Sequence, residues 1–183
     1  MSGYICTSKV DGDASSLLAG PELSGSTVFI STPRRWLTAV VGDGGTLFGH
    51  DDAVVDLGDV FALEGFHPDT GLNFRWRLTA EGGVGATIGS SDVQTEESSR
   101  ILSHIDTEYL LWGSIAEVDD GWAKLHEARV GSIWIPITGS HACVGSRARM
   151  TRREYITRSD DGIAVVADEL YIRLTVESSE TES

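Results

Sequence analysis

The sequence has few cysteines, few lysines and no long hydrophobic run, and each of these shortages excludes a class of protein. Cys6 and Cys143 are the only cysteines among 183 residues, too few for a disulfide scaffold or a four-cysteine zinc site. No stretch approaches the ~18 apolar residues of a membrane-spanning helix, and the N-terminus lacks the features of a secretory signal. We therefore expect a cytoplasmic protein with reduced thiols and no membrane partner.

Positive charge is also scarce. The chain carries 28 acidic and 14 basic residues, which gives a formal net charge of −14. A freely diffusing chain of this charge is repelled by nucleic acid and by anionic lipid, whereas basic proteins attract it. Only Lys9 and Lys124 are lysines, so the remaining basic residues are all arginines.

Short apolar runs alternate with glycine-containing turns along most of the chain, which is typical of antiparallel strands. The expected strand–turn–strand units lie at residues 36–49, 73–88, 108–130 and 151–175. Further strands are expected at 26–31 and at 132–138, where Pro136 indicates an edge or a strand end. The pattern predicts a mainly β protein, an antiparallel hairpin meander that forms a sandwich or half-barrel with one or two short helices.

Residues 73–79 show the clearest alternation: Phe74, Trp76 and Leu78 point one way, Arg75 and Arg77 the other. This pattern predicts a strand with one buried face and one charged face. Helical spacing predicts a helix at 91–105, and residues 15–20 can form a helical turn before a proline.

The composition predicts three segments. Residues 1–24 are rich in Gly, Ser and Asp and are expected to be flexible. Residues 25–176 are expected to form a single mainly β domain, and the acidic residues 177–183 a disordered tail. All five tryptophans fall in expected strands, where packing in the core is the usual role.

The catalytic motifs that can be tested from sequence are absent. The chain has no P-loop, no His-Glu-x-x-His, no Cys-x-x-Cys and no nucleophile elbow. His50-Asp51-Asp52 offers three ligand types in a row, but neighbouring side chains on an extended strand diverge, so a surface turn is the better interpretation. His141 and Cys143 provide only two ligands, fewer than zinc needs. We predict no catalytic residue, no metal and no cofactor.

The strongest local anomaly is a run of arginines at residues 147–158, which holds five of the 14 basic residues. On a strand, Arg147, Arg149, Arg153 and Tyr155 share one face, and Arg152 lies on the other. These five residues are the candidate interaction and RNA-binding site, because an arginine row beside an aromatic ring suits phosphate contact and base stacking. A face that contacts an acidic protein, or one that is solvated or paired within the chain, fits the same pattern.

Several short motifs resemble a family of CRISPR-associated accessory proteins found in type III-D loci. Residues 109–113 read Tyr-Leu-Leu-Trp-Gly, and residues 121–136 run from a Gly-Trp turn to an apolar strand that ends at a proline. Residues 147–156 and 161–174 resemble the basic strand, acidic-Gly turn and Arg-Leu strand with which the family ends. Residues 37–49 resemble its first hairpin, and residues 74–78 its middle strand.

The resemblance implies a non-catalytic subunit of a type III CRISPR RNA-guided effector complex that takes part in antiviral defence. Its expected partners are the backbone subunits of that complex, with guide or target RNA as a further partner. Two alternatives remain from the residues alone. One is a small ribonuclease that uses His126 or His141 with a carboxylate, and the other is a free-standing β-sandwich ligand binder.

Overall fold

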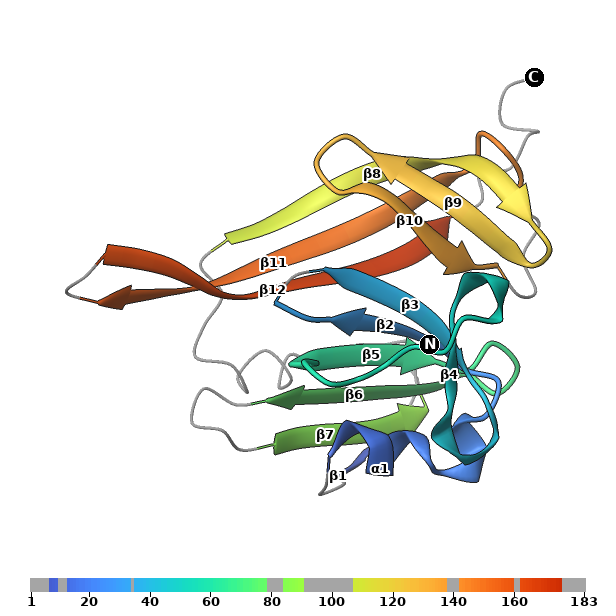
Figure 1. Ribbon diagram of the computed structural model, residues 1–183, viewed down its shortest axis with the longest axis horizontal. Helices are drawn as coiled ribbons and strands as arrows, with labels where there is room; N and C mark the ends of the chain where they lie inside the picture. Colours follow the sequence, from blue (N-terminus) through green and yellow to red (C-terminus); the bar gives the residue numbers. More distant parts are fainter. Residues whose placement is uncertain are drawn as a thin grey trace, which may run out of the picture.

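Two antiparallel sheets make up the fold of the computed structural model (Figure 1). The structure describes residues 7–9, 13–33, 35–78, 84–90, 107–137, 142–159 and 162–175. Within these residues one sheet has seven strands and the other has five and curves into a half-barrel. The predicted mainly β, antiparallel fold class is confirmed.

The seven-stranded sheet holds the first half of the chain, in the strand order β1-β7-β6-β5-β2-β3-β4. Its strands are β1 (Thr7–Lys9), β2 (Thr27–Ser31), β3 (Trp36–Val41), β4 (Leu47–Phe48), β5 (Ala62–Phe66), β6 (Leu72–Leu78) and β7 (Val84–Ser90). The pairing of β3 with β4 and of β6 with β7 confirms the first two predicted hairpins.

The half-barrel holds the second half of the chain, in the order β10-β9-β8-β11-β12. Its strands are β8 (Thr107–Asp119), β9 (Trp122–Glu127), β10 (Gly131–Pro136), β11 (Arg147–Ser159) and β12 (Gly162–Thr175). Pro136 ends the edge strand β10, as predicted. Both edge strands lie against the other sheet, β10 beside β3 and β12 beside β2. Figure 1 also shows the β11–β12 hairpin extending beyond the rest of the sheet as a two-stranded arm.

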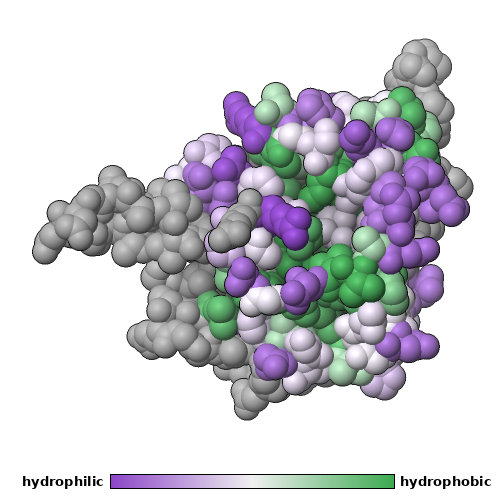
Figure 2. Space-filling model, viewed as in Figure 1, coloured by the Kyte–Doolittle hydropathy of each residue, from purple (hydrophilic) through white to green (hydrophobic). Residues whose placement is uncertain are grey.

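A first hydrophobic core covers one face of the seven-stranded sheet. It contains Val28, Ile30, Leu63, Phe74 and Trp76 from the strands. The helix α1 (Ala14–Leu18) and the 3-10 turn η1 (Pro21–Leu23) add buried leucines to it. The N-terminal segment expected to be flexible therefore contributes to the core, and the predicted helical turn is confirmed. In Figure 2, hydrophobic residues gather near the middle of one face of the molecule, with hydrophilic residues toward its rim.

Strand β5 was not predicted, although it lies at the centre of its sheet. Its sequence contains Glu64 and Gly65, residue types that are depleted in strands. Gly65 is required there because a Cβ atom would lie only 2.7 Å from the backbone oxygen of Thr27 and would also overlap the ring of Phe74. Glu64 is required because it faces Arg75 across the β5–β6 pair.

The half-barrel holds a second core, to which Phe29 of β2, in the other sheet, also belongs. Its buried members are Leu111, Ile115, Ala123, Leu125, Ile135, Ala148, Met150, Leu170 and Ile172. Polar contacts join the two sheets at β3. Trp36 Nε1 donates a hydrogen bond of 3.1 Å to the backbone oxygen of Asp168, and the Thr38 hydroxyl donates one to the backbone oxygen of Trp134.

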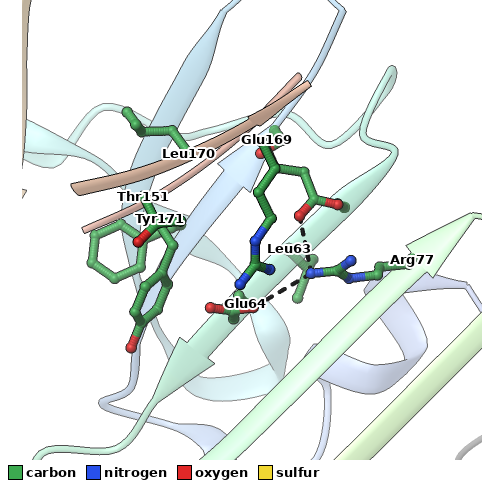
Figure 3. Close-up of a pocket in the computed structure, with 11 residues that line it drawn as sticks. Leu63, Glu64, Arg77, Thr151, Glu169, Leu170 and Tyr171 are labelled. Carbon is green, nitrogen blue, oxygen red and sulfur yellow. Dashed lines mark ion pairs between the residues drawn. The ribbon is translucent and has the colours of Figure 1, made fainter. Parts of the chain in front are cut away.

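A buried ion-pair network also joins the two sheets (Figure 3). Arg77 is 1% exposed, and its guanidinium lies 2.9 Å from Glu169 of β12 and 3.6 Å from Glu64 of β5. Arg75 Nε contacts the same Glu64 oxygen at 2.7 Å. Burial lowers the pKa of Arg75, and the carboxylate of Glu64 opposes that effect. The predicted alternation on this strand is confirmed, but its charged face is buried between the sheets and does not face solvent.

Two predictions concern residues outside the described part of the chain: the helix at 91–105 and the acidic tail at 177–183. In the part that the structure does describe, we find no helix with both the length and the apolar character needed to cross a bilayer.

We predict that Arg77→Met lowers the free energy of unfolding by about 3–5 kcal/mol, because it removes the cation that lies 2.9 Å from the buried carboxylate of Glu169 and leaves Glu64 with Arg75 alone. Denaturant unfolding followed by tryptophan fluorescence measures the change. Arg129→Met, at an exposed turn residue, is the control and should change stability by less than about 0.5 kcal/mol. Equal effects of the two substitutions would contradict a structural role for the network.

Candidate functional site

Strand β11 displays the predicted arginine row in the expected alternation. Ala148 and Met150 are fully buried in the half-barrel, so their neighbours Arg147 and Arg149 point to the opposite face, where both are exposed. Because directly opposite residues of paired strands share a face, Arg149 lies beside Trp112 of β8 and Arg173 of β12. The backbone of Tyr155 is in β11, and its side chain is outside what the structure describes.

Two of the candidate arginines form ion pairs with carboxylates of the same chain. Arg152 binds Asp168 through two hydrogen bonds of 3.2 and 2.9 Å, and its guanidinium lies over the ring of Trp36. The hydrogen bond to Asp168 raises the pKa of Arg152 further, against a smaller lowering by burial. Arg153 donates to Glu108 at 2.8 Å. For these two residues, the interpretation of pairing within the chain fits the structure.

Strand β8 displays exposed apolar side chains beside the arginine row of β11. Leu110 is 60% exposed and Trp112 is 42% exposed. The guanidinium of Arg147 lies 4.5 Å from the centre of the Trp112 ring, within the range of a cation–π contact. We call Leu110, Trp112 and Arg147 the Trp112 face. It exposes a tryptophan where core packing was expected, so that expectation is wrong for Trp112.

Arg149 and Arg173 form a second feature of this side of the molecule. They are direct cross-strand partners on β11 and β12, and both are exposed. Among the described residues neither has an ion-pair partner. Like charges directly opposite each other on paired strands repel, so this pair is a place where an anion would relieve the repulsion.

His50, Asp51 and Asp52 form a turn, as predicted. His50 and Asp51 also converge with Asp119, at the end of β8. The turn is the 3-10 element η3 (His50–Asp52), in which Asp51 and Asp52 have positive φ. His50 Nε2 lies 2.8 Å from Asp119 Oδ2, and Nδ1 lies 3.2 Å from Asp51 Oδ2. The imidazole stacks on the ring of Trp134 at 3.8 Å. The cluster therefore ties the β4–β5 connection to the half-barrel.

The other residues considered for chemistry are isolated within the described part of the chain. His126 is exposed, and its Nδ1 lies 3.1 Å from the Ser132 hydroxyl, without a carboxylate contact. Cys143 is exposed and accepts a weak hydrogen bond from Ser146. His141 and Cys6 are outside the described residues. The described residues among these thus add no nucleophile to the His50–Asp119 pair, so no nucleophile, base and orienting group of the kind that nucleophilic catalysis uses is found in this part of the chain.

Sequence reasoning did not identify Leu110, Trp112 or Arg173 as candidate site residues. A signal for the first two exists, because Leu111, Gly113 and Ile115 alternate toward the core and the residues between them must point outward. No comparable local signal exists for Arg173, since its importance depends on which strand lies beside β12.

A comparison with protein families matches residues 28–174 with a family model described as CRISPR-associated protein Csx19. The match runs from β2 to β12 and so includes every described strand of both sheets except β1. It confirms the CRISPR-associated character that the motifs suggested. A comparison with curated proteins gives no match.

We predict that the two kinds of arginine on β11 differ in their effect on stability. Arg152→Ala should lower the free energy of unfolding by about 1–2 kcal/mol, because it removes a partly buried, two-point contact with Asp168. Arg149→Ala should leave stability unchanged or slightly higher, because it removes a like-charge neighbour of Arg173. Thermal unfolding of both variants measures this difference, and a larger loss in Arg149→Ala would show that Arg149 has a structural role.

Proposed function

The chain belongs to the Csx19 family of CRISPR-associated proteins, and from this premise we propose that it is a non-catalytic, cytoplasmic subunit of a type III RNA-guided effector complex. Membership of the family indicates a role in CRISPR defence. The further step to an accessory subunit is supported by the Trp112 face, which combines exposed apolar surface with arginine on a rigid sheet.

The composition of the Trp112 face favours a protein partner. Tryptophan and arginine are enriched among the residues that dominate binding energy at protein interfaces. Burial of Leu110 and Trp112 by a partner would remove apolar surface from water and stabilise the complex by about 25 cal/mol for each Å² covered. Both side chains stand on the central strand pair β8–β11, so they need little ordering when they bind.

Charge supports the same class of partner. The chain has a net charge of −14, and complementary charge steers an acidic protein toward basic surfaces such as those of RNA-binding subunits. Arg147 then provides a local positive group for a carboxylate of the partner, in a geometry that allows two parallel hydrogen bonds. The general acidity would accelerate association, and the Trp112 face would determine the position of docking.

We predict that Trp112→Ala/Arg147→Ala weakens incorporation into the effector complex by about thirtyfold or more, the effect of losing an interface residue worth about 2 kcal/mol. Co-expression with the other subunits, followed by affinity purification and quantitative mass spectrometry, measures incorporation. The matched control is Val54→Ala/Arg129→Ala, which also removes one exposed apolar side chain and one exposed arginine. Normal incorporation of the Trp112 variant would show that this face is not the docking surface.

We also predict that the isolated protein does not cleave guide or target RNA, with or without Mg²⁺ or Mn²⁺. The described residues hold one group with three possible metal ligands, His50, Asp51 and Asp119, and the ring of His50 is already fixed by Trp134. Denaturing gel electrophoresis of labelled RNA tests this. Cleavage that disappears in His50→Ala, His126→Ala or His141→Ala protein would favour the ribonuclease alternative.

A further inference from the structure

A cavity of about 400 Å³ opens between the two edge strands of the half-barrel. Residues 135–137, at the end of β10, line one side, and residues 171–174 of β12 line the other. Thr27, Phe66 and Asn73 form a row across β2, β5 and β6 and provide the floor. We call this space the edge cavity. Its size lies within the range of about 300–1,000 Å³ that is typical of small-ligand sites.

Aromatic rings and one unsatisfied hydroxyl characterise the lining of the edge cavity. Phe29 packs edge-on against Tyr171 at 5.4 Å and is tilted toward Phe66 at 6.5 Å. Phe66 and Tyr171 are only partly buried, so part of each ring borders the open space. Thr27 is 1% exposed, and its hydroxyl has no hydrogen-bond partner within the described part of the chain. Because a buried unsatisfied hydroxyl is costly, a polar ligand group in the cavity would stabilise it.

The charge of the edge cavity is opposite to that of the protein. No acidic residue is among the described residues that line it, although the chain has twice as many acidic as basic residues. Arg173 lines the cavity, and its cross-strand neighbour is Arg149. His67 also lines it, but both of its ring nitrogens contact the backbone, at Ser24 and Asp69. Arg173 therefore marks the side of the cavity that suits an anion, and Arg149 lies next to it on the neighbouring strand.

We propose that the edge cavity binds a single unpaired nucleotide of RNA, with its phosphate between Arg149 and Arg173 and its base against Tyr171 and Phe66. Bases that are splayed out of a strand stack on aromatic side chains and are read by hydrogen bonds to their edges. The Thr27 hydroxyl supplies such a hydrogen bond at the floor. The inference rests on the proposed function only for its source of RNA, the guide or target strand of the effector complex.

Two other occupants fit the cavity less well. A purely apolar ligand would leave the Thr27 hydroxyl unsatisfied and the Arg149–Arg173 repulsion unchanged. A peptide strand that extended the half-barrel at β10 would meet Pro136, which has no N–H to donate. A nucleotide supplies an anion, an aromatic ring and hydrogen-bonding groups in one molecule, and the cavity offers a complement to each.

The test measures binding of the full-length protein to a labelled, short single-stranded oligoribonucleotide and, separately, to free AMP and UMP. Thr27→Val is the most informative variant. It keeps nearly the same side-chain volume and removes a hydroxyl without a protein partner, so the melting temperature should stay equal or rise. RNA binding should weaken about tenfold through loss of one buried hydrogen bond.

Arg173→Ala should also weaken RNA binding about tenfold and should reduce its salt dependence, because one phosphate contact is lost. Arg129→Ala is the matched control and should bind as the unchanged protein does. Ultraviolet cross-linking followed by peptide mass spectrometry should place the RNA on the peptides that contain Tyr171 or Phe66.

Three outcomes of the binding and cross-linking measurements would overturn the inference. Binding of AMP or UMP without binding of RNA would identify the cavity as a site for a free nucleotide. RNA binding that depends on Arg149 and Arg173 but not on Thr27, with no cross-link to Tyr171 or Phe66, would show a backbone contact outside the cavity. Failure of both ligands to bind would exclude a nucleotide altogether.

Incorporation of Thr27→Val protein into the effector complex separates this inference from the proposed function. We expect it to enter the complex normally, because the Trp112 face is unchanged. Normal incorporation combined with unaltered RNA binding would refute the edge cavity as a nucleotide site and leave the subunit role standing. Failure of the unchanged protein to enter any complex would instead refute the proposed function.

Discussion

The position of strand β12 depends on the buried contact between Arg77 and Glu169. Arg77 belongs to the first sheet and is already committed to Glu64 within that sheet, so its second carboxylate must come from the half-barrel. Glu169 supplies it at 2.9 Å. Because side chains alternate along a strand, this contact also determines where Tyr171 and Arg173 lie, two and four residues further on. The cavity wall and its arginine side therefore depend on this ion pair, together with the pairing of β12 with β11 and the hydrogen bond from Trp36 to Asp168.

Six of the described arginines of this acidic chain fall into two groups with different surroundings. Arg75, Arg77, Arg152 and Arg153 each contact a carboxylate of the chain at 3.2 Å or less. They neutralise acidic residues at the junction of the sheets and between strands. Arg149 and Arg173 have no such contact among the described residues. Within the described part of the chain, these two arginines are therefore available to an anion from outside it.

Local pattern was sufficient to predict most strands, the hairpins and the alternation on β6 and β11. It failed for β5, because Glu64 and Gly65 look unsuitable for a strand until the partners Arg75 and Phe74 are known. It also failed for Trp112, since a tryptophan in an apolar run resembles a core residue unless the alternation around it is counted. The burial of Arg77 could not be foreseen from β6 alone, because its second carboxylate lies on β12, far along the chain.

The arrangement of β12 has a consequence for the order of events during protein synthesis. The seven-stranded sheet emerges from the ribosome first. At that stage the arginines of β6 lack Glu169, and the ring of Phe29 lacks its contact with Tyr171. The strand that covers them, β12, is made after all the other described strands. Contacts between such distant segments form late and carry a large loop-closure cost. The first sheet thus stays incompletely covered until β12 has been made, and the nascent chain exposes these residues to water during that interval.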